Sequence, residues 1–307
     1  MRADALGKRE RMFTKDELLF FLPQFIIYFT FTLLPLIIAL PIIFTDRVNF
    51  IDSTVQFIGL RNFIEIFQSP IVEEMGPAVL RTAFFTFITF LNIFIIGLPL
   101  ALILYEFKSR MNGPFFTIVY MPYVTAPIGV GILLTMLFSL DTGTMNLLLL
   151  KIGLIDKPIN IVNESVARWA LPLMVGWRNA GFNMAILLSG LLTIPDQTVE
   201  ASKIDGASYI SRLRYIYLPQ IIPSIVIATI VTLLRSFGNF DIPVGFGGLR
   251  GNRSAYFLSV MLYQMGFGGS ATQTATLAHA VTISFVVYLP LVIVAIALNK
   301  IQKRFDY

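Results

Sequence analysis

The residues best suited to specific chemistry lie in a polar stretch, Glu200 to Pro219, between two long apolar segments. Its first half combines two acids with small residues, at Glu200, Ala201, Ser202, Asp205, Gly206 and Ala207. A short helix with so little side-chain bulk can lie in a groove of another protein with its backbone close to the wall. Arg212 and Arg214 add basic anchors. The stretch therefore predicts a docking element.

Catalytic or metal chemistry finds little support elsewhere. The chain has one His, His279, and no Cys, so a zinc-type cluster of His and Cys cannot form. We interpret His279 as a packed or hydrogen-bonded residue. There is no Gly-rich loop ending in Lys followed by Ser or Thr, so we expect no ATP site of that type. We assign no catalytic residue, no metal ligand and no cofactor.

The composition places these residues in a membrane. Of 307 residues, 56% are hydrophobic and 13% are charged, about half the charged share of a soluble domain. Mean hydropathy is +0.77. A chain this apolar belongs in a bilayer. The formal charge of +5 does not indicate a nucleic-acid partner, because the basic residues cluster at segment ends instead of forming a stripe with aromatic residues.

A helix needs about 20 apolar residues to cross the hydrocarbon core. Six segments meet this length, and they predict an all-α integral membrane protein with six transmembrane helices. The apolar run after the basic N-terminus is too long for a signal peptide, so we expect an uncleaved first helix. The predicted spans are Leu18–Thr45, Val79–Tyr105, Phe115–Leu140, Trp169–Ile194, Pro219–Phe237 and Leu277–Asn299.

Lys and Arg predict the orientation, since they are enriched on the cytoplasmic side. With the N-terminus inside, the cytoplasmic pieces 1–17, 106–114, 195–218 and 300–307 carry 13 bases in 58 residues. The opposite segments 46–78, 141–168 and 238–276 carry 7 in 100. We expect cytoplasmic termini, a cytoplasmic N-terminal segment over 1–17 and a single transmembrane domain over 18–307. The polar loop at 195–218 then faces the cytoplasm.

The outer segments are not simple linkers. Apolar residues within 46–78 predict that part of this segment packs on the helices. Segment 238–276 is rich in Gly, which permits tight turns and close backbone approach. It has two interpretations: a flexible connector, or a docking or gating loop.

Arg178 lies about nine residues into its predicted span, roughly 13 Å deep at 1.5 Å per residue. A charge at that depth is costly and usually faces a cavity or a partner. Asn179 and Asn183 follow it on the same helix. The alternative interpretation is hydrogen bonding between helices inside the bundle. Arg235, near the outer end of the fifth span, can extend its charge to the interface.

Several motifs occur in an order that resembles one family. The stretch at 200–207 is similar to the pattern E-A-A-x-x-D-G-A, and Leu218-Pro219 follows it. Further matches are Phe21 to Asp46, Phe57 to Phe63, Met121-Pro122, Gly143 with Asn146, Gly153-Leu154, Gly176 to Phe182 and Gly190 to Pro195. Together they resemble permease subunits of ABC importers over roughly residues 18–300. The arrangement is most similar to the first permease of maltose or glycerol-phosphate type carbohydrate importers.

The resemblance implies the type I ABC importer permease fold and a function: a transmembrane permease of an ATP-driven, binding-protein-dependent importer for a sugar, oligosaccharide or sugar derivative. It implies that Glu200, Ala201, Ser202, Asp205, Gly206 and Ala207 couple the chain to an ATPase, and that Arg178, Asn179, Asn183, Asn239 and Asp241 are candidates to line the cargo pathway. The implied partners are a second homologous permease, two ATP-binding subunits, an extracytoplasmic solute-binding protein and the lipid bilayer. The implied location is a bacterial or archaeal cell (inner) membrane.

Three departures concern partner matching: Ser202 replaces the second Ala, Leu249 replaces a common Pro, and Ser189 replaces Ala. Each conserves size or backbone freedom. Other functions stay open. An importer for an amino acid, polyamine or phosphate ester has the same outline. A secondary transporter would need intramembrane carboxylates, and a membrane-embedded enzyme would need a cluster of His, Asp or Glu. The predicted spans hold almost no acids.

Overall fold

A computed structural model describes residues 15–302 apart from 53, 108 and 268–274. Within these residues the secondary structure is helical, and extended pairing is limited to one bridge between Thr45 and Phe57. The all-α class is therefore confirmed. The predicted N-terminal segment 1–17 and tail 300–307 lie mostly outside the described residues.

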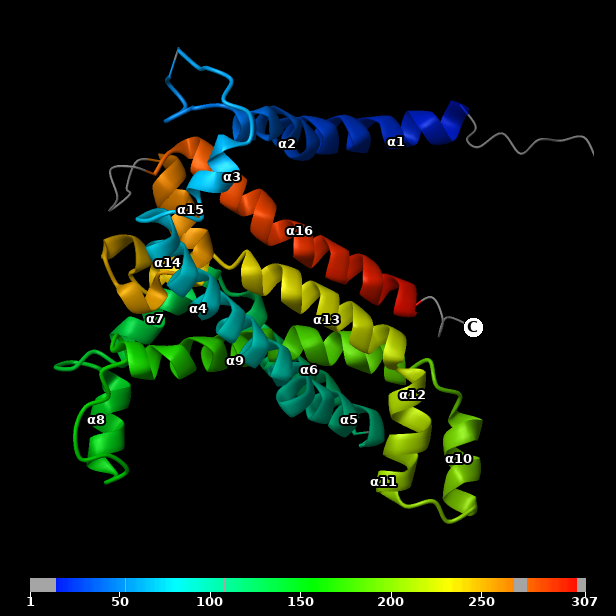
Figure 1. Ribbon diagram of the computed structural model, residues 1–307. Coiled ribbons are helices and arrows are strands. Elements are labelled where there is room, and N and C mark those ends of the chain that lie inside the picture. The colour runs from blue at the N-terminus through cyan, green and yellow to red at the C-terminus, as the bar shows by residue number, and fades with distance from the viewer. Residues whose placement is uncertain (1–14, 53, 108, 268–274, 303–307) are drawn as a thin grey trace, which may run out of the picture.

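Helices cover most of each predicted span, although several of these spans are bent or begin at other residues (Figure 1). The first comprises α1 (Lys15–Tyr28) and α2 (Leu34–Ala39), and the second comprises α4 (Ile71–Asn92) and α5 (Leu98–Glu106). Next come α6 (Asn112–Val124), α7 (Pro127–Leu137), α9 (Glu164–Leu191) and α13 (Ile222–Phe237), and then α16 (Leu277–Gln302). Shorter helices are α3 (Arg61–Glu65), α8 (Thr144–Lys151), α10 (Asp196–Ile204), α11 (Tyr209–Arg212), α12 (Leu218–Gln220), α14 (Asp241–Gly245) and α15 (Leu258–Phe267).

By length and apolarity, three continuous segments of the described chain can cross a membrane: Leu19–Phe44, Ile71–Glu106 and Leu277–Lys300. Two bent pairs raise the number to five, α6 with α7 at 91° and Tyr209–Gln220 with Ile222–Phe237 at 67°. The remaining predicted span lies in α9, which has 28 residues but includes Arg168 and Arg178. The count of six thus stays a prediction.

Proline shapes three of these segments in the same way. Pro35, Pro99 and Pro219 each stand second in a helix that follows a five-residue π-helical turn, at 29–33, 93–97 and 213–217. A proline removes one backbone donor and its ring clashes with the carbonyl four residues earlier. Just before each proline, the backbone N–H of Leu34, Leu98 or Leu218 bonds to the carbonyl five residues back. The wider turn accommodates the ring without ending the helix.

Helix α9 is the centre of the bundle and packs against α4, α5, α6 and α13. Its glycines allow close approach: a Cβ added at Gly181 would lie 2.5 Å from Tyr120 Cα of α6, and one at Gly176 would meet the Asn92 side chain of α4. The buried face of α9 includes Leu171, Met184 and Leu187. Through these contacts α9 fixes the positions of the functional side chains that it carries.

The outer segments are structured, as the apolar residues of 46–78 predict. Ile66 is fully buried, and the Asn62 side chain donates to Ile43 O at 2.7 Å. In 238–258, Ile242 and Phe246 are buried in a core cluster with α7 and α9. A flexible connector is therefore the wrong interpretation for 238–258, which is packed; residues 268–274 lie outside the described part of the chain.

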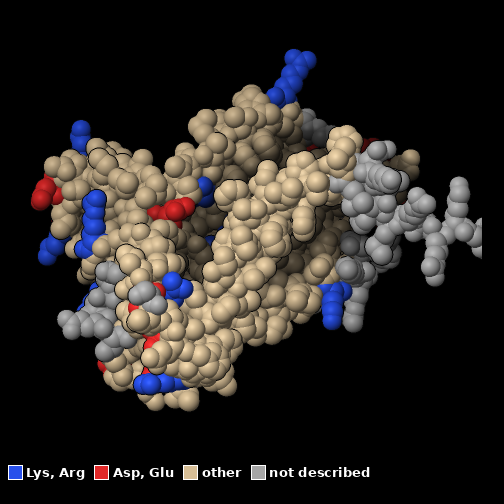
Figure 2. All heavy atoms as spheres, turned by 90° about the horizontal axis from the view of Figure 1, so that it is seen from above, with Lys and Arg blue, Asp and Glu red and all other residues tan. Residues whose placement is uncertain are grey.

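The start of α1, the end of α16 and helices α10 and α11 lie toward the same end of the molecule (Figure 1). This common end agrees with the prediction that they share one side of a membrane, although it does not identify the side. Uncharged residues cover most of the face seen from above, and most of the charged side chains on it lie in the left half of the view (Figure 2). Only 11% of the first and of the last apolar segment is buried within the chain, so both offer apolar surface to lipid or to a partner.

Candidate functional site

The polar loop forms two short helices, α10 and α11, at one end of the bundle (Figure 1). Val199 is buried and anchors α10, whereas Glu200 and Asp205 are exposed. Ile204 and Ile210 are also exposed, at 87% and 74% of their surface. Exposed isoleucines beside acids form a surface suited to docking on another protein. Of the six predicted coupling residues, three lie in α10 and three in the turn that follows it; Ser202 and Ala207 are half-buried and the other four are exposed.

Gly206 ends α10 in the left-handed conformation, with φ of +77°. The Gly206 N–H donates to Lys203 O at 3.1 Å and the Ala207 N–H donates to Ser202 O at 3.0 Å. This pair of bonds is the Schellman motif, in which glycine avoids the steric cost of positive φ. A Cβ at Gly206 would meet nothing within 4 Å. The polar stretch is therefore not a single short helix, because the chain turns at Gly206 between α10 and α11.

Arg212 is not the free anchor that the sequence suggests. Its Nη1 donates to Ala207 O at 3.0 Å, and its side chain is 13% exposed. Arg214 is exposed and stacks against Tyr215, with 5.6 Å from the guanidinium carbon to the ring centre. Of the two bases, Arg214 is the one available to a partner.

The second site is a cavity of about 600 Å³ between α9 and the segment from α13 to α14. Four of the five predicted pathway residues line it: Arg178, Asn179, Asn239 and Asp241. Asn183 does not. Its side chain is 1% exposed and packs against Gly97. Asn183 follows Arg178 by five residues, so it lies on a different face of the helix, against the π-helical turn 93–97 that precedes α5.

Arg178 holds the sharp bend between α6 and α7. Its Nη2 donates to Tyr123 O at 2.9 Å and to Thr125 O at 3.0 Å, and its Nη1 donates to Asn179 Oδ1 at 3.2 Å. These carbonyls lie at the end of α6, where backbone acceptors lack helical partners. Hydrogen bonding between helices, the alternative interpretation, is therefore part of the role of Arg178. The residue also lines the cavity.

Tyr123 and Arg235 also line the cavity and were missed by sequence reasoning, and Phe182 packs against both of them. The Tyr123 and Phe182 rings stack, with centres 4.8 Å apart. The Arg235 guanidinium lies 4.6 Å from the Phe182 ring centre and donates to the Tyr123 hydroxyl. Arg235 therefore turns into the cavity instead of extending to the interface. Guanidinium groups and aromatic faces are groups that bind hydroxylated rings. The one sequence feature that could have indicated a cavity role for Arg235 is that arginine is rare in an apolar span.

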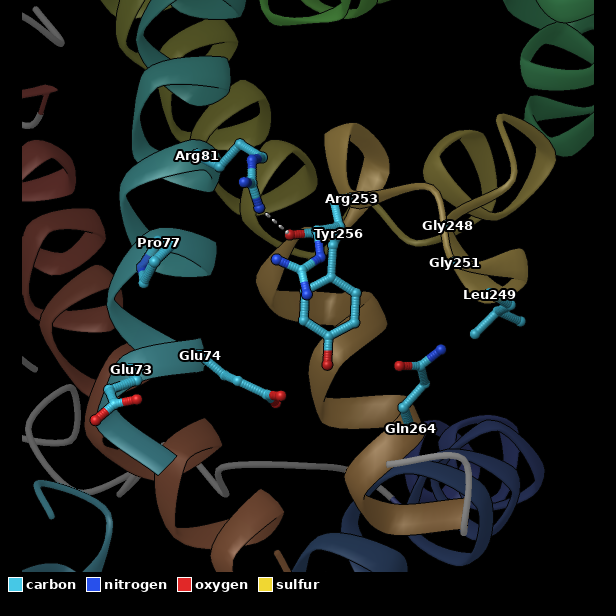
Figure 3. Close-up of a pocket in the computed structure, with 10 residues that line it drawn as sticks. All are labelled: Glu73, Glu74, Pro77, Arg81, Gly248, Leu249, Gly251, Arg253, Tyr256 and Gln264. Carbon is cyan, nitrogen blue, oxygen red and sulfur yellow. Dashed lines mark hydrogen bonds between the residues drawn. The ribbon is translucent and has the colours of Figure 1, made fainter. Parts of the chain in front are cut away.

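A further cavity of about 500 Å³ lies between α4, α15 and the segment 248–256 (Figure 3). Arg81 Nη1 donates to Tyr256 O at 3.0 Å, and Arg81 Nη2 pairs with Glu164 at 2.8 Å. Figure 3 shows the side chains of Glu74, Tyr256 and Gln264 pointing into this space. Glu74 Oε2 has no hydrogen-bond partner there. The cavity lies at the end of the bundle opposite α10 and α11 (Figure 1).

His279 connects α16 to α3, as its interpretation as a hydrogen-bonded residue predicts. Its Nδ1 accepts from the Thr276 N–H at 3.2 Å, and its Nε2 lies 3.0 Å from Glu65 Oε2. Burial alone raises the pKa of Glu65, but hydrogen bonds from His279 and Arg61 outweigh it and lower that pKa below the ordinary value of 4.5. No group of three or more potential metal ligands occurs among the described residues.

A model of the family described as "Binding-protein-dependent transport system inner membrane component" matches residues 93–306. The matched region includes the loop at 195–218 and the residues that line the α9 cavity.

The relatives include several sugar transport proteins. The lactose transport system permease protein LacF of Rhizobium radiobacter is 27% identical over 293 residues, which is 94% of each chain. The sulfoquinovosyl glycerol transport system permease protein SmoG of Agrobacterium fabrum is 30% identical and covers 82% of this chain and 77% of that protein. The trehalose/maltose transport system permease protein MalF of Thermococcus litoralis is 28% identical, covering 88% and 91%.

Solved structures share the fold. A chain of a bacterial ABC transporter involved in the import of the acidic polysaccharide alginate has a TM-score of 0.75 and 23% identity, covering 94% of this chain and 95% of that one. A chain of the MetNI methionine ABC transporter has a TM-score of 0.54 and 22% identity, covering 78% of this chain and all of that one.

Proposed function

The chain belongs to the family of binding-protein-dependent transport system inner membrane components, and we propose that it forms half of the membrane pathway for a carbohydrate or carbohydrate derivative. It is a multi-pass membrane protein and a permease subunit of an ABC importer, not an enzyme. The observation that carries the proposal is the family match over residues 93–306, because this region contains both the exposed loop and the α9 cavity.

The carbohydrate cargo is supported by the relatives and by the cavity. Relatives similar over most of the chain are permeases for lactose, for trehalose or maltose, and for sulfoquinovosyl glycerol. The cavity offers amide groups at Asn179 and Asn239, a carboxylate at Asp241 and an aromatic ring at Tyr123. Hydrogen-bonding groups around an aromatic surface suit a polyhydroxylated ring. Asn183 is left out of the proposed pathway, since it packs against Gly97 in the turn before α5.

The exposed loop is the proposed contact with the ATPase. We assign docking to the surface formed by Glu200, Ala201, Ser202, Asp205, Gly206 and Ala207, with Arg214 beside it. ATP-driven closure of an ATPase pair would move α10 and shift the helices between outward and inward forms. A ligand shifts such an equilibrium only by its different affinity for the two forms. The closed ATPase and the docked binding protein must therefore both favour the outward form.

The proposed assembly has one copy of this chain, a second similar permease, two ATP-binding subunits and an extracytoplasmic binding protein. ABC importer partners of this kind occur with the alginate relative, whose structure includes a pentasaccharide-bound periplasmic protein. The loop then faces the cytoplasm, with both termini on that side. The cavity of Figure 3 would face the binding protein, because it lies at the other end of the bundle.

Transport by the reconstituted assembly tests the function. The complex in lipid vesicles should take up a labelled oligosaccharide and hydrolyse ATP faster when its binding protein carries that sugar. Labelled methionine, a polyamine and a phosphate ester form the comparison panel, and uptake of one of these in place of sugars would replace the cargo assignment. Vesicles holding only this chain should be inactive. Uptake by them, driven by an ion gradient, would instead indicate a secondary transporter.

A further inference from the structure

Three side chains at the cytoplasmic end of the bundle form a connection that the proposed function does not use. Glu106 is the last residue of α5, Arg212 ends α11, and Tyr217 lies in the π-helical turn that follows. The Tyr217 hydroxyl donates to Glu106 Oε1 at 2.5 Å. Arg212 Nη2 lies 3.7 Å from the same oxygen, and Arg212 Nε donates to the Tyr217 hydroxyl at 3.4 Å.

The connection is shielded from water. Tyr217 is fully buried, and the side chains of Arg212 and Glu106 are 13% and 18% exposed. The Tyr105 ring packs edge-on against Tyr217, with centres 5.5 Å apart and planes at 82°. Charged hydrogen bonds in a shielded setting are stronger than those at an open surface, where water and salt screen them. This cluster is therefore a firm joint between separate helices.

The joint connects the docking loop to a helix that is distant in sequence. Arg212 Nη1 also donates to Ala207 O at 3.0 Å, the first residue after the turn at Gly206. One guanidinium thus links the end of α10 to α5. Helix α5 in turn packs on α9, which carries Arg178 and Asn179 of the cavity. Along the chain, the loop is joined to α9 on one side and to α12 on the other. The contacts with Glu106 therefore give the loop an additional mechanical connection, to α5.

We propose that Glu106, Arg212 and Tyr217 form an ionic latch that makes the 195–218 loop and α5 move as one body, so that ATPase motion reaches the cavity through α5. The inference rests on the proposed docking role of the loop. The three residues are positioning residues, because they act through α5 and contact neither cargo nor nucleotide. The acid and the base have opposite charges on different elements, which makes the latch testable by exchanging them.

Coupling measurements test the latch in the reconstituted complex. Glu106→Gln and Arg212→Glu should each lower the amount of cargo transported per ATP hydrolysed by about tenfold, which corresponds to about 1.4 kcal/mol. Arg212→Glu places two acids together and should have the larger effect. The double exchange Glu106→Arg with Arg212→Glu should restore most of the ratio. Arg110→Gln is the matched control, since Arg110 is an exposed base just beyond α5 and should keep the wild-type ratio.

Motion can be measured directly because the chain has no Cys. Ile103 of α5 and Ile210 of α11 are exposed, and spin labels on Ile103→Cys and Ile210→Cys report the distance between the two elements. Adding ATP with vanadate should leave this distance unchanged with the latch intact and should change it in the Glu106→Gln background. Co-purification with the other subunits shows that each variant assembles.

The outcomes separate the latch from the function on which it rests. If the wild-type complex responds to cargo while Glu106→Gln and Arg212→Glu match its transport ratio and label distance, the latch is wrong and the proposed function stands. Failure of the double exchange to restore a ratio lost in both assembled single variants also overturns the latch. A wild-type complex that shows no cargo-stimulated hydrolysis overturns the proposed function and the latch with it.

Discussion

The turn at Gly206 gives the sharpest prediction about coupling. Replacing Gly206 by Ala or Val puts a side chain on a residue with φ of +77°. The added Cβ meets nothing within 4 Å inside the chain, so the cost within the chain is conformational. A non-glycine residue in the left-handed region costs roughly 1–2 kcal/mol, and a β-branched one sits at the upper end. Asn tolerates this region, so Gly206→Asn should cost less.

A cost of about 1–2 kcal/mol changes the population of the native turn by roughly 5-fold to 30-fold. We therefore expect cargo-stimulated ATP hydrolysis by the reconstituted complex to fall about fivefold or more in Gly206→Val. Gly206→Ala should have a smaller effect, and Gly206→Asn should remain close to the wild type. The assay is the rate of phosphate release with and without loaded binding protein. Membrane insertion should be normal in all three variants, because the turn lies outside the apolar helices.

The chain supplies a matched control at Gly153, after α8. Gly153 has φ of +71° and free space around its Cβ, and it ends α8 with the same pair of bonds, from Gly153 N–H to Leu150 O and from Leu154 N–H to Leu149 O. Gly153→Val should carry the same strain but keep stimulated hydrolysis. Full activity in Gly206→Val would refute the reasoning. Equal damage from Gly206→Asn and Gly206→Val would show that bulk against the ATPase matters more than the backbone angle.

Four other substitutions have defined outcomes. Glu200→Lys should abolish cargo-stimulated hydrolysis while the chain still inserts; full stimulation would contradict docking at α10. Arg178→Ala should lower the melting temperature of the purified complex, because three hydrogen bonds from its charged guanidinium are lost, at about 1.5–3 kcal/mol each. Arg235→Gln should instead lower uptake with little change in melting temperature; the reverse pattern would contradict these roles. Because the pKa of Glu65 is lowered in the native state, its contribution to stability is present above the unfolded pKa and is lost as pH falls through the native one. The melting temperature should therefore fall with acidification below about pH 4.5, and it should fall less steeply in Glu65→Gln; equal slopes would contradict the contribution.

Local pattern was sufficient to predict the helical class, the apolar segments and the exposed loop. Hydropathy over 20 residues and the position of basic residues depend on composition within a window, and the bilayer imposes a strong physical requirement on both. The predicted segment Leu277–Asn299 differs from the structural one, Leu277–Lys300, by a single residue. Pro35, Pro99 and Pro219 also mark points where a regular helix is disturbed. The π-helical form of the turns before them was not predicted.

Tertiary structure decided what each polar side chain contacts. Arg178 bonds to carbonyls 53 and 55 residues away, and Tyr217 bonds to Glu106 across 111 residues. The sequence identified Arg178, Asn179, Asn239 and Asp241 as unusual, but the packing of α9 against its neighbours placed them on one cavity and turned Asn183 away. The same packing moved Arg212 inward and brought Arg235 onto Phe182. A buried charge must find partners wherever the fold supplies them, and those partners are distant in sequence, so no local pattern could reveal them.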